Sequence, residues 1–319
     1  MSQDRNHSSR SFATMALATA LLTIGLIVFG AVVRVTDSGL GCGNAWPSCN
    51  GTFFPPLDNV TAWIEWLHRL FAVLIGLFGL VTLWLAVRAY RTRNRFVLNA
   101  TLIAAGLFLL QSALGALVVV LDLPPTMVTL HLGTAMLLLG ALLVAALWAT
   151  ARPHAHYASD RFTVLAYITT VLSLVIILTG ALVRGSGATL ACIDWPLCNG
   201  QILPLGQGQL ALIHMLHRLA VVALGVTIVM LVWMAYKQRT DGRLRLFAVL
   251  ALVAFLAQAG IGALYVLTVA APLWGALHVT FAALTWAALV TLTVLEMVNT
   301  RNVNSMGQQW PQQSKPLPN

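Results

Sequence analysis

Charged side chains are scarce in this sequence. Only 8% of its 319 residues are Asp, Glu, Lys or Arg, whereas a soluble globular domain carries about 25%. Carboxylates are the rarest, with 9 Asp and Glu against 18 Lys and Arg, while 59% of the residues are hydrophobic. This composition excludes a water-soluble fold and predicts an integral membrane protein. The net charge of +9 reflects membrane topology rather than nucleic-acid binding, so no nucleic-acid partner is expected.

Long runs of alternating polar and apolar residues are also missing, which excludes a transmembrane β-barrel. The apolar segments are instead continuous and reach the ~20 residues that a spanning helix needs. The first apolar segment is too long for the core of a signal peptide, so we expect it to stay in the mature chain. The sequence therefore predicts an all-α protein whose eight transmembrane helices lie at residues 12–35, 61–88, 96–121, 126–151, 162–185, 208–236, 246–270 and 272–296.

The basic residues predict the orientation in the membrane. Placing both termini in the cytoplasm puts the clusters at 88–95 and 237–245 inside, together with most other Lys and Arg residues. The segment before the first helix is too short for a transit peptide, which favours a prokaryotic plasma membrane. Four arginines are left on the outer side and need another explanation: Arg34, Arg69, Arg184 and Arg218.

The sequence matches itself when it is shifted by about 150 residues. GAVVR at 30–34 corresponds to GALVR at 180–184, and WLHRL at 66–70 corresponds to MLHRL at 215–219. Because each unit holds four expected helices, both units begin and end on the same side of the membrane, unlike inverted transporter repeats.

The repeat predicts the domain organisation. We expect two pseudo-symmetric, parallel four-helix bundles, one formed by residues 1–155 and the other by residues 156–300. Residues 301–319 are polar and rich in Gln and Pro, which predicts a disordered cytoplasmic tail.

Four histidines recur at matching positions of the two units. Counting along the helices places each of them about 10 Å below the outer surface. Two facing imidazoles inside a four-helix bundle are typical of axial haem ligands. Hydrogen bonding between helices is the alternative, and zinc is disfavoured because the second unit offers no further ligand at that depth. The candidate haem-iron ligands are His68, His131, His217 and His278.

The four outer arginines suit a haem held near the outer surface, because its propionates would point outward. Guanidinium groups bind carboxylates in a bidentate manner. Arg69 and Arg218 directly follow a candidate ligand, whereas Arg34 and Arg184 end their helices on the outer side. The alternative for each arginine is snorkelling to the membrane interface.

All four cysteines lie in two outer loops, with the spacings C-x6-C and C-x5-C. The space outside the membrane permits disulfides. The repeat favours local pairing over the other pairings that four cysteines allow, so we expect Cys42–Cys49 and Cys192–Cys198. A structural clip on each loop is one interpretation. A redox-active pair is the other, because strained disulfides are easier to reduce, and metal binding is disfavoured.

These features together resemble the haem A synthase family of bacterial and mitochondrial membranes. The resemblance covers residues 12–296 and rests on the eight helices, the two cysteine loops, the EWLHR stretch at 65–69 and the spaced histidines. It implies oxidation of a methyl group of haem O to a formyl group, which gives haem A, with oxygen from water. It also implies that one half carries haem b for electron transfer while the other takes haem O as substrate.

The resemblance further implies partners. A haem O synthase would hand over haem O, and a terminal oxidase or its assembly factors would receive haem A. The lipid bilayer surrounds the protein, and a homo-oligomer is left open.

One carboxylate occurs in the first unit and has no counterpart in the second, and this difference predicts which half is catalytic. Glu65 lies three residues before His68 on roughly the same helix face, and the matching residue of the second unit is His214. A carboxylate near a haem can accept protons or stabilise a cationic centre, and contact with a propionate or the loop is the alternative. We expect His214 to support the second site without ligating. The expected catalytic residues are Glu65, His68 and His131, and the expected haem b ligands are His217 and His278.

Two functions of other classes stay open at the level of sequence. A bis-histidine cytochrome b that exchanges electrons with quinone explains the histidines and arginines, but it does not explain why only one half has Glu65. A transporter or haem chaperone without catalysis is disfavoured, because the spans are unbroken and the polar residues gather near the outer face.

Overall fold

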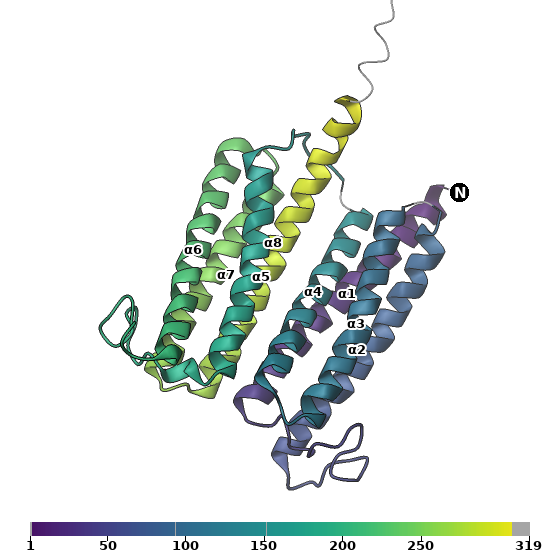
Figure 1. Ribbon diagram of the computed structural model, residues 1–319. Helices are drawn as coiled ribbons and strands as arrows, with labels where there is room; N and C mark the ends of the chain where they lie inside the picture. Colours follow the sequence, from purple (N-terminus) through teal and green to yellow (C-terminus); the bar gives the residue numbers. More distant parts are fainter. Residues whose placement is uncertain (1, 93, 151, 308–319) are drawn as a thin grey trace, which may run out of the picture.

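The part of the chain that the structure describes contains eight long helices, which lie side by side (Figure 1). The computed structural model describes residues 2–92, 94–150 and 152–307. Each long helix contains a segment that is long and apolar enough to cross a membrane. Within the described ranges there is no β-strand, so the predicted all-helical membrane fold is confirmed. The helices are α1 (Ser2–Val35), α2 (Val60–Tyr90), α3 (Arg95–Val120), α4 (Pro125–Thr150), α5 (Arg161–Gly185), α6 (Gln209–Gln238), α7 (Gly242–Leu267) and α8 (Pro272–Gly307).

Local sequence explains where these helices begin. The first backbone N–H groups of a helix lack partners within it, and a polar side chain before the helix supplies an acceptor. Asn94 accepts hydrogen bonds from the first turn of α3, and Asp160 does the same for α5. Pro125 and Pro272 open α4 and α8, where the missing proline N–H costs nothing.

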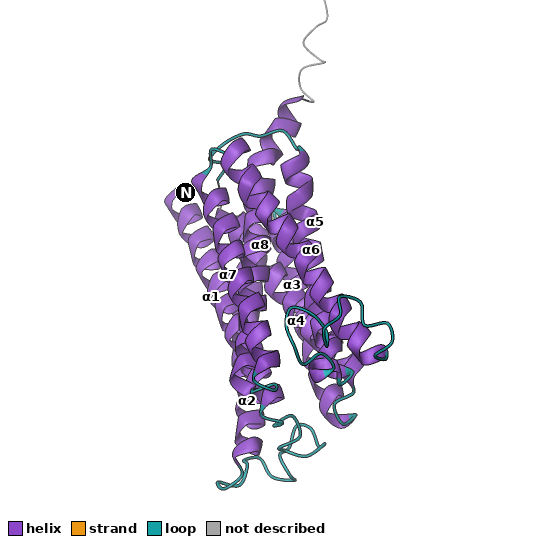
Figure 2. Cartoon of the chain, turned by 90° about the vertical axis from the view of Figure 1, so that its left-hand side faces the viewer, coloured by secondary structure: helices purple, strands orange, loops and turns teal. Residues whose placement is uncertain are grey.

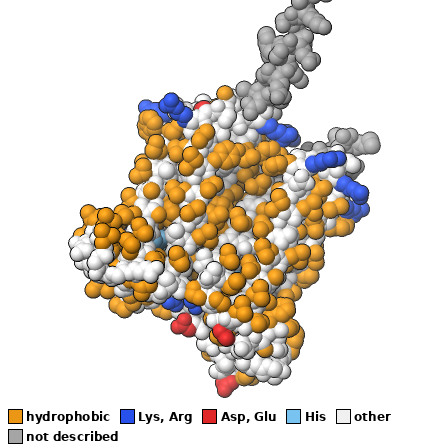
Figure 3. Space-filling view, viewed as in Figure 1, with side chains coloured by type: hydrophobic (Ala, Val, Ile, Leu, Met, Phe, Trp, Pro, Cys, Tyr) orange, Lys and Arg blue, Asp and Glu red, His pale blue; other side chains and the backbone are white. Residues whose placement is uncertain are grey.

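The helices form two groups, α1–α4 and α5–α8, which Figure 1 shows next to each other. Figure 2 shows both cysteine loops as irregular chain at one end of the molecule, which we call the loop end. The N-terminus lies at the opposite end, here called the N-terminal end. Figure 3 shows hydrophobic side chains covering the middle of the visible face, with charged side chains near the two ends. This distribution suits helices that face lipid.

Helices α4 and α8 join the two groups. In their most apolar windows, 61% of α4 and 78% of α8 is buried inside the protein, more than in any other span of the described chain. The indole of Trp286 on α8 donates a hydrogen bond of 2.8 Å to the carbonyl of Met136 on α4. A Cβ at Gly140 would lie 3.2 Å from the same indole, so a small residue is needed there. Close packing at small residues and hydrogen bonds between helices are what hold helices together in lipid.

The repeated sequence folds into repeated local geometry. Each cysteine loop ends in an Asn-Gly pair whose two residues are both left-handed, with φ of 50° and 79° at Asn50 and Gly51 and of 50° and 80° at Asn199 and Gly200. The flanking residues pair across each turn, as expected for a two-residue Asn-Gly hairpin. The two units thus share their loop conformation, and the predicted symmetry axis along the membrane normal stays a prediction.

At the N-terminal end of the molecule, a buried ionic cluster joins the helices of the second half. Arg239, between α6 and α7, donates to Asp160 at 3.0 and 2.7 Å and to Glu296 on α8 at 3.1 and 2.7 Å. The hydrogen bond from Arg239 is the main reason why the pKa of Asp160 lies below its usual value. Among the described residues of α1–α4 no ion pair joins two helices at this end. Phe12 and Tyr90 pack edge to face there instead.

The beginning of the tail differs from the expectation. Residues 301–307 were predicted to be disordered, but α8 continues to Gly307. Because a helix satisfies its backbone hydrogen bonds internally, it does not have to end where its apolar residues end. Arg301 also lies over the ring of Trp148 on α4, 5.3 Å from its centroid. Residues 308–319 lie outside the described residues, so disorder there stays a prediction.

Candidate functional site

Each of the four candidate histidines packs against a glycine of the preceding helix. This arrangement is the same in both halves, although the four helix pairs are separate. A side chain in place of any of these glycines would press on the imidazole. A Cβ would lie 3.3 Å from the His68 ring at Gly30, 3.2 Å from His131 at Gly115, 3.1 Å from His217 at Gly180 and 2.9 Å from His278 at Gly262.

In the second half, both imidazoles are held through Nδ1. Nδ1 of His217 lies 2.9 Å from the hydroxyl of Thr179 on α5, and Nδ1 of His278 lies 3.0 Å from the carbonyl of Gln258 on α7. Since a carbonyl only accepts, Nδ1 of His278 carries the proton and Nε2 has a free lone pair. No described residue hydrogen-bonds Nε2 of either ring. A metal-ligating histidine is usually oriented in this way by its other nitrogen.

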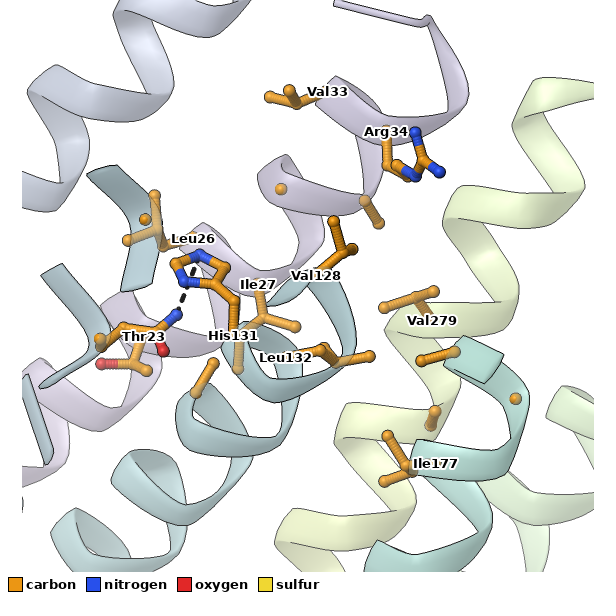
Figure 4. Close-up of a pocket in the computed structure, with 18 of the residues that line it drawn as sticks. Thr23, Leu26, Ile27, Val33, Arg34, Val128, His131, Leu132, Ile177 and Val279 are labelled. Atoms are coloured by element: carbon orange, nitrogen blue, oxygen red, sulfur yellow. Dashed lines mark hydrogen bonds between the residues drawn. The ribbon is translucent and has the colours of Figure 1, made fainter. Parts of the chain in front are cut away.

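In the first half, the imidazoles are held differently. Nε2 of His131 on α4 lies 3.1 Å from the side-chain amide nitrogen of Gln111 on α3, drawn as the dashed line in Figure 4. Its Nδ1 is buried and has no hydrogen-bond partner. His68 on α2 stacks on Phe29 of α1, with 5.9 Å between ring centroids. The first pair is therefore less firmly oriented for ligation than the second.

One cavity reaches all four histidines. Its volume is about 1380 Å³, which exceeds the ~300–1,000 Å³ of a typical small-molecule pocket. His68 and His131 interact electrostatically with each other, and so do His217 and His278, so each half brings its two imidazoles together. Figure 4 shows His131 facing α1, with Val279 of the second half on the far wall.

The residues present fit a haem in each half. Each half offers two imidazoles on separate helices, glycines beside them and an apolar wall, as expected for a bis-histidine haem in a bundle. The buried Nδ1 of His131 and the buried Nε of Arg184 also lack partners. A bare metal ion fits less well, because the described part of the chain contains no cluster of three His, Cys, Asp or Glu residues.

The four predicted arginines fall into two classes. Arg69 directs its guanidinium to carbonyls of the first cysteine loop, at 3.4 Å from Ala45 and 3.1 Å from Ser48. Arg218 binds the second loop in the same way, through carbonyls that include Asp194 at 2.9 Å and Leu197. The structure thus uses Arg69 and Arg218 to hold the loops, and their predicted contact with haem propionates stays a prediction.

Arg34 and Arg184 form the other class. Both line the cavity and lie within electrostatic range of each other, one from each half. Figure 4 shows Arg34 near the end of α1, above His131. The carboxylate nearest to Arg184 is the exposed Asp37, at 3.8 Å. These guanidinium groups are therefore available to a negatively charged group in the cavity.

Glu65 is buried and both of its carboxylate oxygens have partners. One accepts a 2.8 Å hydrogen bond from the backbone N–H of Cys42, and the other pairs with Arg69 at 2.5 Å. Glu65 also lines the cavity. The second half has the buried His214 in this place, and its loop carboxylate comes from Asp194, which accepts from the N–H of Gly200 at 2.8 Å. A loop contact, one of the two sequence interpretations, is therefore present at Glu65.

Comparison with known proteins places the chain. The family described as cytochrome oxidase assembly protein, COX15-CtaA, matches residues 13–290. A protein named "Heme A synthase" from Symbiobacterium thermophilum is 33% identical over 272 residues, which cover 80% of this chain and 86% of that protein. The chain belongs to the haem A synthase family. Relatives with the same name in Shouchella clausii and Halalkalibacterium halodurans are 30% and 32% identical, over 88% and 81% of this chain and 95% and 88% of theirs.

Both expected disulfides are present in this member of the haem A synthase family, as Cys42–Cys49 and Cys192–Cys198. All four cysteines are fully buried, packed against the first turns of α2 and α6. A buried sulfur is poorly accessible to a redox partner, which favours the structural clip over the redox-active pair. The Trp-Pro pair inside each loop lines the cavity. Each disulfide therefore stabilises a loop that forms part of the cavity wall.

The structure also reveals residues that sequence reasoning missed. Gln111 and Gln258 recur in the two units and both contact a candidate histidine, but one does so through its side chain and the other through its backbone. The repeat contained this signal without indicating a role. Thr179 had no signal, because a threonine in an apolar helix commonly bonds its own backbone.

Proposed function

We propose that the chain is a haem A synthase that oxidises a methyl group of haem O to a formyl group. Conversion of a methyl group and one water into a formyl group releases four electrons and four protons. The family membership supports the haem substrate, and the four histidines supply a site for it and a site for a resident haem. The electrons leave the protein for an acceptor outside the chain.

This proposal rests mainly on a difference between the two histidine pairs, because hydrogen bonds orient the second pair more firmly than the first. His217 and His278 are both oriented through Nδ1, which suits a cofactor that stays bound. His68 and His131 lack this arrangement, which suits a substrate that must enter and leave. Haem b, when held in the second half, supplies a one-electron carrier. We therefore assign residues 1–155 to substrate and catalysis and residues 156–300 to haem b.

The side chains around the first pair have separate tasks in this proposal. Arg34 and Arg184 bind the propionates and set the orientation of the substrate. Glu65 holds Arg69 and the first loop, and it accepts a proton released by the substrate. A carboxylate has about four lone-pair positions, and two hydrogen bonds leave room for that proton. The clipped loop excludes bulk water and side reactions.

The proposal extends to the surroundings of the protein. Both termini lie in the cytoplasm of a prokaryotic cell, and the cysteine loops lie outside the plasma membrane. Haem O arrives from a haem O synthase, and haem A passes to a terminal oxidase or its assembly factors. Oxygen is taken from water.

The test compares His68→Ala with His217→Ala, which are matched positions of the repeat. Both variants are purified, and their bound haems are extracted and identified by mass spectrometry after expression with a haem O supply. We expect His217→Ala to lose haem b, and His68→Ala to keep haem b without forming haem A. Loss of haem b from both variants alike contradicts the division of labour. Absence of any formylated haem from the wild type favours the electron-carrying cytochrome b instead.

A further inference from the structure

The shared cavity is much deeper in the first half than in the second. We follow it from the histidine level toward the N-terminal end. In the first half, its lining runs from Gly30 to Thr19, from His68 to Leu83, from Gly115 to Thr101 and from His131 to Leu142. In the second half, it runs from Gly180 to Ile176, from His217 to Gly225, from Gly262 to Phe255 and from His278 to Ala282. At 1.5 Å per residue, the first half reaches about 16–22 Å and the second about 6–12 Å. We call the additional depth the first-half arm.

Two substitutions in the repeat account for this difference. Gly79 and Thr82 line the arm on α2. The matching residues on α6 are Ile228 and Leu231, which are fully buried in the core of the second half. A Cβ at Gly79 would meet no atom within 4 Å, so the space beside it is open. The larger side chains fill the corresponding space in the second half.

The floor of the arm is apolar in effect, although it contains threonines. Thr19, Thr23, Thr82 and Thr101 each donate the hydroxyl proton to the carbonyl four residues earlier in the same helix. Thr19 and Thr82 also lie 3.0 Å apart through their hydroxyl oxygens. These hydroxyls therefore do not require water, and an apolar ligand does not leave them without partners.

The arm also opens toward lipid. Val73, Leu77 and Leu80 on α2 and Leu109 on α3 line the cavity and are at the same time 55–70% exposed on the protein surface. Residues that have both properties mark a side opening between these two helices. A ligand with a long apolar part can thus pass from the bilayer into the arm without crossing water.

We propose that the first-half arm binds the long isoprenoid substituent of haem O, and that Gly79 and Thr82 select for it. This inference rests on the proposed function. Haem O differs from haem b by that substituent, and a haem without it needs no such arm. The unequal depth therefore explains how one chain with two similar histidine pairs places each haem in its own half. Ile228 and Leu231 exclude the substituent from the second half.

The test fills the arm with the residues of the second half. Purified protein that carries its resident haem is titrated with haem O and, separately, with haem b, and binding is followed by the Soret absorbance. In Gly79→Ile/Thr82→Leu we expect the haem O affinity to fall at least about tenfold, the effect of roughly two buried methylene groups. The haem b affinity should change less than about twofold. Gly106→Ile is the matched control, because Gly106 lies at similar depth on α3, faces open space and does not line the cavity.

The outcomes separate this inference from the proposed function. If the double variant keeps the wild-type ratio of haem O affinity to haem b affinity, the proposed role of the arm is wrong. It is also wrong if the wild type binds both haems equally well. If the double variant does not fold, Gly79→Ala and Gly106→Ala replace it in the test. We then expect Gly79→Ala to lose haem O affinity, by less than the double variant would, and Gly106→Ala to keep it. A wild type that prefers haem O but forms no haem A leaves the arm intact and overturns the proposed synthase.

Discussion

Glu65 has two separable roles, and its replacement tests both. The carboxylate is buried, accepts a hydrogen bond from Cys42 and pairs with Arg69. Glu65→Ala removes both contacts. It leaves the Cys42 N–H without its acceptor, at about 1–3 kcal/mol, and a partly buried guanidinium without its counter-charge, at up to about 3–5 kcal/mol. Because Arg69 keeps its loop carbonyls, we expect a total loss of about 3 kcal/mol.

Glu65→Gln separates stability from chemistry. The amide oxygen still accepts from Cys42, so the loss of stability should be only about 1–2 kcal/mol. If Glu65 accepts a substrate proton, haem A formation should nevertheless fall by about 100-fold or more per folded molecule, the usual contribution of a general base. The assay combines unfolding in detergent with the amount of haem A per folded protein, measured by mass spectrometry.

Asp194→Asn is the matched control, because it changes a loop carboxylate of the second half. It should weaken the second loop and leave the yield of haem A per folded molecule close to that of the wild type. Wild-type yield from Glu65→Gln refutes the chemical role. Wild-type stability of Glu65→Ala refutes the anchoring role, whatever the activity shows.

Three further predictions concern the rest of the structure. Gly262→Ala brings a Cβ to 2.9 Å from His278, so the Soret band of the haem b that we propose for the second half should weaken while the protein stays folded. Burial alone would raise the pKa of Asp241, but hydrogen bonds, first among them that from Arg243, lower it from 3.8 to about 2. Asp241 should therefore stabilise the fold by about 2 kcal/mol above pH ~4 and lose this effect between pH ~4 and ~2; in Asp241→Asn the unfolding temperature should fall less over that range. Trp286→Phe removes the hydrogen bond between α8 and α4, and unfolding should show a loss of about 1 kcal/mol.

Helix positions were predictable because they depend on quantities that the sequence displays directly. Apolar length, helix-capping residues and the prolines at Pro125 and Pro272 determine the spans. The predicted bounds lie close to those observed, except that α1 begins earlier, at Ser2, and α8 ends later, at Gly307. The repeat predicted which histidines would meet, because matching positions in two copies constrain one another. The local disulfides followed from the same symmetry.

Side-chain direction was less predictable, because the position of a residue on a helix does not show which of several nearby groups its side chain contacts. Arg69 follows His68 in sequence, but its guanidinium reaches the loop carbonyls. Arg239 belongs to the basic cluster at 237–245 that was used only to predict orientation, but its guanidinium is buried and pairs with Asp160 and Glu296. Neither partnership follows from spacing, since the loop path and the approach of α5 to α8 arise only in three dimensions.

The buried cluster around Arg239 fastens the second half through charges that have no counterpart among the described residues of the first half. The second half is fastened at both ends, by its clipped loop and by charges that tie α5, the α6–α7 connection and α8 together. The first half is fastened at the loop end, and aromatic packing replaces the charges at the other. Separating α5 from α8 would leave ions unpaired, whereas separating α1 from α2 would break apolar and aromatic contacts and the contact between the Thr19 and Thr82 hydroxyls, without unpairing any charge. The two halves therefore differ in what must be broken to separate their helices at the N-terminal end.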